Sequence, residues 1–363
     1  MSGLTTAQIE DIIGSWPDPY LGQDLKTAGA IQSVEIRDGK PVITLVLGYP
    51  ARGIEAGIIS DLGARLEKEA GLDSADISIE YRVIPHAVQQ GVQLLPNVKN
   101  TIAIASGKGG VGKSTTAINL ALALQAEGAR AGILDADIYG PSQPRMLGCH
   151  MKPDTTDGKH IEPNISYELQ SMSIGYLIEE DTPMIWRGPM VTSALEQLLH
   201  DTNWSDLDYL VIDLPPGTGD IQLTLCQKIP VSGAIIVTTP QDIALMDAKK
   251  ALKMFEKVSV PVLGIVENMS THICTQCGYE EHIFGSGGGE QMSRQYGVEM
   301  LGSLPLDITI REGVDNGKPT VAMEPDSGIS QRYREIARKA AARLARQAKD
   351  YSSRFPKIVV ENN

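Results

Sequence analysis

Ser106-Gly107-Lys108-Gly109-Gly110-Val111-Gly112-Lys113-Ser114-Thr115-Thr116 is the stretch that decides how the rest of this 363-residue sequence is interpreted. It follows an apolar run at residues 101–105, which has the character of a β-strand, and precedes a helical run at 117–127. A strand, a glycine-rich turn ending in Lys-Ser, and a helix form the context in which the pattern G-x-x-x-x-G-K-[ST] binds phosphate. The sequence therefore predicts a phosphate-binding loop for a nucleoside triphosphate.

The residue types in this loop suit a polyphosphate. Its glycines adopt positive φ angles without strain, so the backbone can approach an anion closely. Lys113 is placed to reach the β- and γ-phosphates, and the Ser114 hydroxyl to ligate Mg²⁺. An ordinary glycine-rich turn is the structural alternative, which the flanking strand and helix disfavour. We expect the nucleotide to contact Gly107, Lys108, Gly109, Gly110, Val111, Gly112, Lys113, Ser114 and Thr115.

The composition is that of an ordinary folded protein, with 42% hydrophobic and 21% charged residues. A formal net charge of −13 argues against sequence-independent binding to nucleic acid, which needs a basic surface. No apolar run approaches the roughly 20 residues that span a bilayer, and the first residues lack the features of a secretory signal. We therefore expect a cytoplasmic protein that binds no nucleic acid.

The chain divides into two units of different pattern. Residues 1–92 predict a small α+β domain, with helices at 6–15 and 53–70 and strands at 31–36, 41–47 and 75–83. Asp38-Gly39-Lys40 is a hairpin signal between the first two strands. Residues 93–100 are expected to be a linker before a larger domain at 101–350.

The larger domain alternates short apolar strands with helices, a pattern typical of a doubly wound, mostly parallel sheet. In such sheets ligands bind at the carboxyl ends of the strands. The expected helices lie at 117–127, 192–200, 221–228 and 245–258. The expected strands lie at 101–106, 131–135, 209–213, 234–239, 262–268 and 298–304.

Carboxylates follow two of these strands. Asp137, just beyond the strand 131–135, could position an attacking water or a Mg²⁺-bound water, as phosphoryl transfer requires. Asp213 ends the strand 209–213, where a carboxylate supports the Mg²⁺ shell. The Pro- and Gly-rich residues 214–220 then form a candidate switch that senses the γ-phosphate. The structural alternative for Asp137 is an ordinary aspartate in a turn, and the alternative for residues 214–220 is a plain loop.

Cys274 and Cys277 form a C-x-x-C pair, which is half of a four-thiolate site. The remaining cysteines, Cys149 and Cys226, lie in unrelated elements, where we expect buried small hydrophobes. Two copies of the chain would supply four thiolates, enough for a bridging [4Fe–4S] cluster or a zinc ion.

Two alternatives for the cysteine pair stay open on motif chemistry. A zinc site within one chain could add His272 or His282 to the thiolates. A dithiol redox motif usually opens a helix, which the following Gly278-Tyr279 does not favour.

A second lysine, Lys108, lies within the phosphate loop. The pattern Gly-Lys-Gly-Gly-Val-Gly-Lys-Ser-Thr resembles the deviant Walker A motif of the nitrogenase iron protein and of MinD-type ATPases. In that class the extra lysine reaches the nucleotide of the partner subunit. The resemblance therefore implies a homodimer in which Lys108 acts across the interface.

Residues 101–345 resemble the Mrp/ApbC family of iron–sulfur carrier ATPases. The motifs that carry the resemblance are the phosphate loop, Asp-Ala-Asp-Ile-Tyr-Gly-Pro-Ser (135–142), Trp-Arg-Gly-Pro-Met (186–190), Asp-Leu-Pro-Pro-Gly-Thr-Gly-Asp (213–220), and the C-x-x-C that follows Glu-Asn-Met-Ser (267–270). The unit at 1–92 resembles the small domain often fused to these ATPases.

The family implies a slow ATPase that binds a [4Fe–4S] cluster at a homodimer interface and passes it to apo iron–sulfur proteins. Cys274 and Cys277 would hold the cluster. By the same resemblance, Asp137 is the switch I aspartate, and Asn268 lies where related ATPases use an asparagine on adenine, which favours ATP.

A positioning ATPase of the MinD/ParA kind is the alternative, with a structural zinc at the cysteine pair. MinD relatives use a C-terminal amphipathic helix on membranes, and residues 331–350 form a basic helix here. Its apolar face is mostly alanine, which buries little area. We therefore expect a helix docked on the domain, no stable membrane association, and a flexible tail at 351–363.

Overall fold

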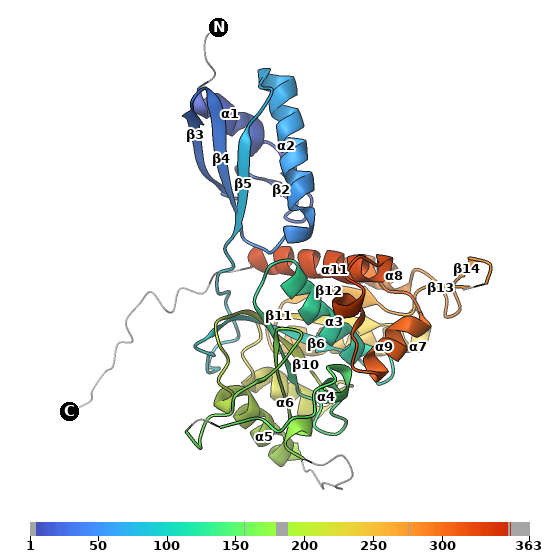
Figure 1. Cartoon of the computed structure of the whole chain (residues 1–363). Coiled ribbons are helices and arrows are strands. Elements are labelled where there is room, and N and C mark those ends of the chain that lie inside the picture. Colours follow the sequence, from blue (N-terminus) through green and yellow to red (C-terminus); the bar gives the residue numbers. More distant parts are fainter. Residues whose placement is uncertain (1–4, 156, 179–187, 275, 348, 350–363) are drawn as a thin grey trace.

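A computed structural model describes the chain except residues 1–4, 156, 179–187, 275, 348 and 350–363 (Figure 1). The N-terminal domain pairs β3 with β4 in antiparallel fashion and β4 with β5 in parallel. Asp38 and Gly39 both adopt positive φ (51° and 78°), as the predicted two-residue hairpin requires. The elements of the N-terminal domain are α1 (Thr6–Gly14), β1 (Pro17–Asp18), β2 (Gln23–Asp24), β3 (Ile31–Arg37), β4 (Lys40–Leu47), the 3₁₀ turn η1 (Arg52–Ile54), α2 (Glu55–Ala70) and β5 (Asp76–Tyr81).

The larger domain is built on an eight-stranded sheet in the order β15-β12-β11-β6-β10-β7-β9-β8. All neighbours run parallel except β8, which is antiparallel to β9. The strands are β6 (Val98–Ala105), β7 (Ala131–Asp135), β8 (Asn164–Ser166), β9 (Leu169–Ser173), β10 (Leu207–Asp213), β11 (Gly233–Thr238), β12 (Val262–Glu267) and β15 (Met300–Ser303). This order confirms the predicted doubly wound, mostly parallel sheet.

Helices connect these strands and pack against the sheet (Figure 1). A two-stranded hairpin, β13 (His272–Ile273) with β14 (Glu280–Glu281), projects from the body of the domain. The remaining elements are α3 (Lys113–Ala126), α4 (Gln143–Met146), η2 (Ile174–Tyr176), α5 (Gly188–Asp201), α6 (Asp220–Lys228), α7 (Asp242–Lys257), α8 (Gly288–Tyr296), α9 (Ile308–Asp315), α10 (Thr320–Met323) and α11 (Gly328–Ala345).

Several element boundaries differ from the sequence-based expectations, and two of the differences concern the ends of the larger domain. β6 begins at Val98, so the last three residues expected in the linker belong to the strand, where Val98 pairs with Leu207 and Asn100 with Tyr209. The C-terminal helix ends at Ala345 rather than near 350. The expected tail at 351–363 lies outside the described residues.

The C-terminal helix α11 is docked, as expected. Tyr333, Ile336, Ala340 and Leu344 on its apolar face are all at most 1% exposed, because α11 packs against α3 and β15. None of the helices that the structure describes is long and apolar enough to cross a bilayer.

A buried ion cluster joins the two domains beneath the N-terminal sheet. The fully buried Glu127, which follows α3, accepts hydrogen bonds from Arg334 Nε (2.7 Å) and Arg338 Nη1 (2.6 Å) of α11. Its other carboxylate oxygen accepts a hydrogen bond from the backbone N–H of Gly53 at 2.8 Å. Arg338 also lies over the Tyr20 ring of the N-terminal domain. The helix that starts in the phosphate loop therefore ends at a contact with the small domain.

Candidate functional site

The glycine-rich loop lies between the carboxyl end of β6 and the first turn of α3, the position where parallel α/β sheets bind ligands. Gly110 and Gly112 adopt φ angles of 79° and 80°. A Cβ atom on Gly107 would overlap the backbone of Asp247 in α7, and one on Gly112 would overlap the Asn268 side chain. Close packing therefore requires glycine at position 107, and the positive φ favours it at position 112, where a Cβ atom would also crowd Asn268.

Lys113, the first residue of α3, is ion-paired with Asp213, the last residue of β10. The lysine also lies 3.2 Å from the Ser114 hydroxyl through its Nζ atom. The second carboxylate oxygen of Asp213 accepts a hydrogen bond from Gln143 Nε2 at 2.9 Å. The structure thus brings three predicted site residues, Lys113, Ser114 and Asp213, into one cluster.

Asp135 is a buried carboxylate of this cluster that sequence reasoning missed. It ends β7 in register with Asp213 and is fully buried. It accepts hydrogen bonds from the backbone N–H groups of Ser142 (2.9 Å) and Gln143 (3.0 Å), and from the Ser173 hydroxyl (3.1 Å). Burial and the neighbouring Asp213 charge raise the pKa of Asp135. Its place as the last residue of an apolar strand, like that of Asp213, was the available signal.

Asp137 lies two residues beyond β7 and is half-buried. Burial raises its pKa above the ordinary aspartate value, Lys113 opposes that change, and Asp213 adds to it. Electrostatic coupling to both residues places Asp137 at the same cluster. Its backbone N–H donates a hydrogen bond to Asp135 Oδ1 at 3.1 Å, which fixes the turn that presents it.

The candidate switch at 214–220 is attached to the phosphate loop. The Gly217 N–H donates to the carbonyl oxygen of Ser106 at 2.9 Å, and the Gln222 amide donates to the Pro216 carbonyl at 2.5 Å. Gly217 has a φ of 101°, which other residues rarely adopt. The conformation of the loop between β10 and α6 is therefore linked to the position of the phosphate loop, which follows β6.

Asn268 and Lys108 have different surroundings at the edge of this cluster. Asn268 is buried, and its amide donates to the Val111 carbonyl at 2.9 Å, so it anchors the phosphate loop. Lys108 is half-exposed, and among the described residues its ammonium group has one hydrogen bond, to the Gln241 amide oxygen at 3.5 Å. The expected roles of Asn268 toward adenine and of Lys108 across a dimer stay predictions.

The cysteine pair lies in the projecting hairpin between β13 and β14 (Figure 1). The Cys274 N–H donates to the Tyr279 carbonyl at 2.9 Å, and the Gly278 N–H donates to the Cys274 carbonyl at 2.8 Å. Cys274 is half-exposed and Cys277 is exposed. Hydrogen bonds from the backbone N–H groups of Gln276 and Cys277 lower the pKa of the Cys274 thiol. The pair is thus accessible and its thiolate is stabilised.

The described part of one chain does not complete a metal site around the pair. No group of three or more histidine, cysteine, aspartate or glutamate side chains within it is arranged to hold a metal ion. His272 and His282 instead direct Nδ1 at the carbonyl oxygens of Leu306 (3.0 Å) and Ser270 (2.9 Å). These contacts occupy Nδ1 and leave Nε2 of each ring open to a metal, so they do not decide against a zinc site within one chain.

The two remaining cysteines are buried, as predicted. Cys226 is 0% and Cys149 is 7% exposed, and burial raises the pKa of the Cys226 thiol to about 12. Neither is suited to bind metal or to react from this position.

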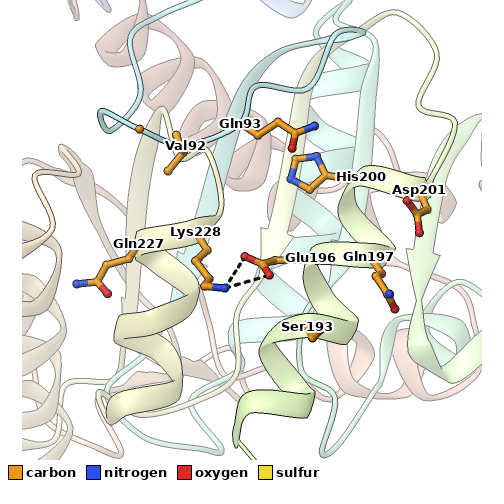
Figure 2. Close-up of a pocket in the computed structure, with 10 residues that line it drawn as sticks. Val92, Gln93, Ser193, Glu196, Gln197, His200, Asp201, Gln227 and Lys228 are labelled. Atoms are coloured by element: carbon orange, nitrogen blue, oxygen red, sulfur yellow. Dashed lines mark hydrogen bonds and ion pairs between the residues drawn. The ribbon is translucent and has the colours of Figure 1, made fainter.

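A cavity of about 540 Å³ between α5, α6 and residues 91–93 contains none of the predicted site residues (Figure 2). The Lys228 ammonium crosses it to contact Glu196 at 3.0 Å. Burial lowers the pKa of His200, which is opposed by the Glu196 and Asp201 carboxylates. The cavity is a polar cleft separate from the phosphate loop.

Two family profiles match this chain. The family profile described as NUBPL iron-transfer P-loop NTPase matches residues 97–341. The chain belongs to this family. A second profile, described as iron–sulfur cluster assembly protein, matches residues 6–79. The resemblance to Mrp/ApbC carriers is thereby confirmed. Of the motif at 186–190, Trp186 and Arg187 lie outside the described residues.

Curated relatives of this chain have corresponding names. The iron–sulfur cluster carrier protein of Escherichia coli K12 is 49% identical over 339 residues, which are 93% of this chain and 92% of the relative. That of Pseudomonas fragi is 59% identical over 269 residues, 74% of this chain and 94% of the relative. The mouse iron–sulfur cluster transfer protein NUBPL is 49% identical over 252 residues, 69% and 79% of the two chains.

Solved structures support the fold of the NTPase domain. A nucleotide-binding protein of Archaeoglobus fulgidus in complex with ADP aligns with a TM-score of 0.55 and 36% identity, over 64% of this chain and 90% of that chain. The cell division ATPase MinD of Pyrococcus furiosus aligns with a TM-score of 0.50 and 24% identity, over 66% and 97% of the two chains. The latter likeness concerns the fold alone.

Proposed function

We propose that this chain binds and slowly hydrolyses ATP, holds a [4Fe–4S] cluster between two copies of itself, and transfers the cluster to apo iron–sulfur proteins. The accessible Cys274–Cys277 hairpin on a phosphate-loop domain carries the proposal, because it offers half of a four-thiolate site. The names of the carrier relatives support the same cargo.

The loop residues 107–115 would surround the phosphates with backbone N–H groups. Lys113 would exchange its contact with Asp213 for the β- and γ-phosphates. Asp137 would accept or orient the attacking water. Its raised pKa favours the proton-accepting role near neutral pH. Asn268 supports this site by holding the loop through the Val111 carbonyl, and we assign it the adenine contact as well.

The residues present fit a Mg²⁺ ion with the nucleotide. A hard cation prefers oxygen donors. The Ser114 hydroxyl and the Asp213 carboxylate both contact Lys113 Nζ, and Asp213 is in register with the buried Asp135. Ser114 and Asp213 would hold the ion, which neutralises phosphate charge when bound. The crowding of Asp135 and Asp213 around one lysine is consistent with a site that receives a further cation.

We infer a homodimer because one chain supplies only part of the proposed cluster site and part of the proposed nucleotide site. Two thiolates in the described part of the chain leave half of a cluster's four ligand positions unfilled. The Lys108 side chain makes one long hydrogen bond to the described residues, at Gln241, so it could turn toward a nucleotide on the partner. We assign residues 1–92 to a domain that accompanies the carrier function and the whole chain to the cytoplasm, which suits its free thiols.

Anaerobic reconstitution with iron and sulfide, followed by metal analysis and light scattering, tests the proposal. We expect about four irons per dimer, and transfer of that iron to an added apo-[4Fe–4S] protein. Zinc at one per chain or per dimer without iron uptake would contradict it. The chain would then be a positioning ATPase with a structural zinc.

A further inference from the structure

A basic groove lies between α6 and α7, outside the residues assigned to nucleotide and cluster. Its cavity has a volume of about 440 Å³. Leu223 and Met254 supply an apolar lining, and the lining also includes four lysines of α7, namely Lys249, Lys250, Lys253 and Lys257. We call these lysines with the apolar pair the α7 groove.

The charge of the α7 groove is opposite to that of the whole chain. Four lysines line it against one carboxylate, Asp220, whereas the chain carries a formal net charge of −13. Lys250 pairs with Asp247 at 2.9 Å and Lys253 with Glu256 at 2.7 Å, both at exposed positions where pairing is weak. No carboxylate in the described part of the chain pairs with Lys249 or Lys257. The groove therefore keeps unneutralised positive charge.

Two of the lysines also lie over an aromatic ring. The ammonium groups of Lys249 and Lys253 lie over the Tyr296 ring of α8, 5.9 and 5.7 Å from its centroid. Lysines beside an apolar floor match a ligand that combines carboxylates with apolar side chains.

The other wall of the groove belongs to the candidate switch. Thr218, Gly219 and Asp220 line the cavity, and the preceding Gly217 is hydrogen-bonded to Ser106 at the start of the phosphate loop. Gly219 is the N-cap residue of α6, and as a glycine it has no side chain that could hydrogen-bond the first turn of the helix. A partner in the groove would thus contact the segment that links α6 to the nucleotide site.

We propose that the α7 groove docks an acidic, partly apolar segment of the protein that receives the cluster. The proposal rests on the carrier function proposed above and names the chemistry of its partner. Charge complementarity favours an acidic protein segment, and the overall charge of −13 disfavours a nucleic acid in the same place. The apolar floor gives the segment a place for one or two hydrophobic side chains.

Binding of a fluorescein-labelled peptide that alternates glutamate and leucine tests the groove without requiring a cluster. We expect the wild-type chain to bind it, and the variant Lys250→Glu/Lys257→Glu to bind at least about ten-fold more weakly. Carbodiimide cross-linking should join peptide glutamates to lysines at 249–257. Raising NaCl from about 0.05 to about 0.5 M should weaken the complex.

The matched control is Lys152→Glu/Lys159→Glu, which reverses two exposed lysines outside α7 with the same change in net charge. It should alter the affinity by less than about two-fold. Equal weakening in both variants, or cross-links spread over lysines of the whole surface, would overturn the proposal. Loss of self-association in the α7 variant would also overturn it, since the groove would then bind a second copy. Iron uptake is not part of this readout, so failure here and failure of the carrier function are distinguishable.

Discussion

The ammonium group of Lys113 and the carboxylate of Asp213 form an ion pair in which the side chains are 6% and 0% exposed. One residue begins α3 and the other ends β10, so the pair ties the phosphate loop to the neighbouring strand. In the function proposed above, a bound nucleotide would compete with Asp213 for this lysine. Phosphate binding would then release the Asp213 carboxylate from the ion pair.

Replacing Lys113 with alanine should reduce ATP hydrolysis at least about a hundred-fold, because a charge that stabilises the transferring phosphate is removed. No hydrogen bond or ion pair joins Lys113 to the described residues of the cysteine hairpin, so iron content after reconstitution should stay at the wild-type value. Lys152→Ala is the matched control and should leave both values unchanged. Loss of iron together with hydrolysis would mean that nucleotide site and cluster site cannot be separated.

The rate constant kcat/KM for ATP should fall toward acid pH, with its midpoint above the ordinary aspartate range near pH 4. Burial raises the pKa of Asp137, so its carboxylate is ionised only at higher pH, and activity that needs the ionised form rises with pH through that raised value. A pH–rate profile checks this. A midpoint at or below pH 4 would show that the ionisation of Asp137 does not limit the reaction.

Much of the fold followed from local patterns in the sequence. Asp38-Gly39 predicts the hairpin because both residues tolerate positive φ, and the apolar runs predict the inner strands of the sheet. The β8–β9 pair was missed because its turn, Tyr167-Glu168, adopts positive φ (52° and 61°) without glycine. Its strands are also short, with polar residues at several positions.

The candidate site was predictable where a residue follows a recognisable strand, as Lys113 and Asp213 do. Asp135 was not assigned because Asp135 and Asp137 both end the same run, and only the register of β7 on β10 shows which is fully buried. The Asn268–Val111 hydrogen bond joins residues 157 positions apart. Such contacts depend on tertiary packing, which no local pattern encodes.

Cys274→Ala should abolish cluster binding while nucleotide binding stays unchanged, because the hairpin supplies two of the four proposed thiolates. Metal analysis after anaerobic reconstitution, with nucleotide titration on the same sample, measures both. Cys149→Ala removes a buried thiol of no proposed function and should keep its iron. Full iron occupancy in Cys274→Ala would rule out the assigned ligand set.

Lys108→Ala should weaken ATP-dependent dimerisation and hydrolysis together, whereas the nucleotide affinity of a single chain should change little. The reason is that, in the part of the chain that the structure describes, the Lys108 ammonium group has a single long hydrogen bond, to Gln241 at 3.5 Å. Light scattering with and without a non-hydrolysable ATP analogue checks the first effect. A mixture of Lys108→Ala and Lys113→Ala chains checks the second effect. In a mixed dimer the Lys108→Ala chain keeps its own Lys113 and receives Lys108 from its partner, so hydrolysis should return at that nucleotide. Wild-type dimerisation and hydrolysis in Lys108→Ala would contradict a role across the interface.

Glu127→Ala should lower the free energy of unfolding by about 3–5 kcal/mol, because it leaves two arginines buried without their carboxylate. Glu127 is fully buried between Arg334 and Arg338, and it also accepts the Gly53 N–H of the small domain. Denaturant titration of the full chain measures the change. Glu335→Ala is the control, since it breaks an exposed pair with Lys339 and should change stability by less than about 1 kcal/mol. Equal losses in the two variants would mean that the buried cluster does not stabilise the contact between the domains.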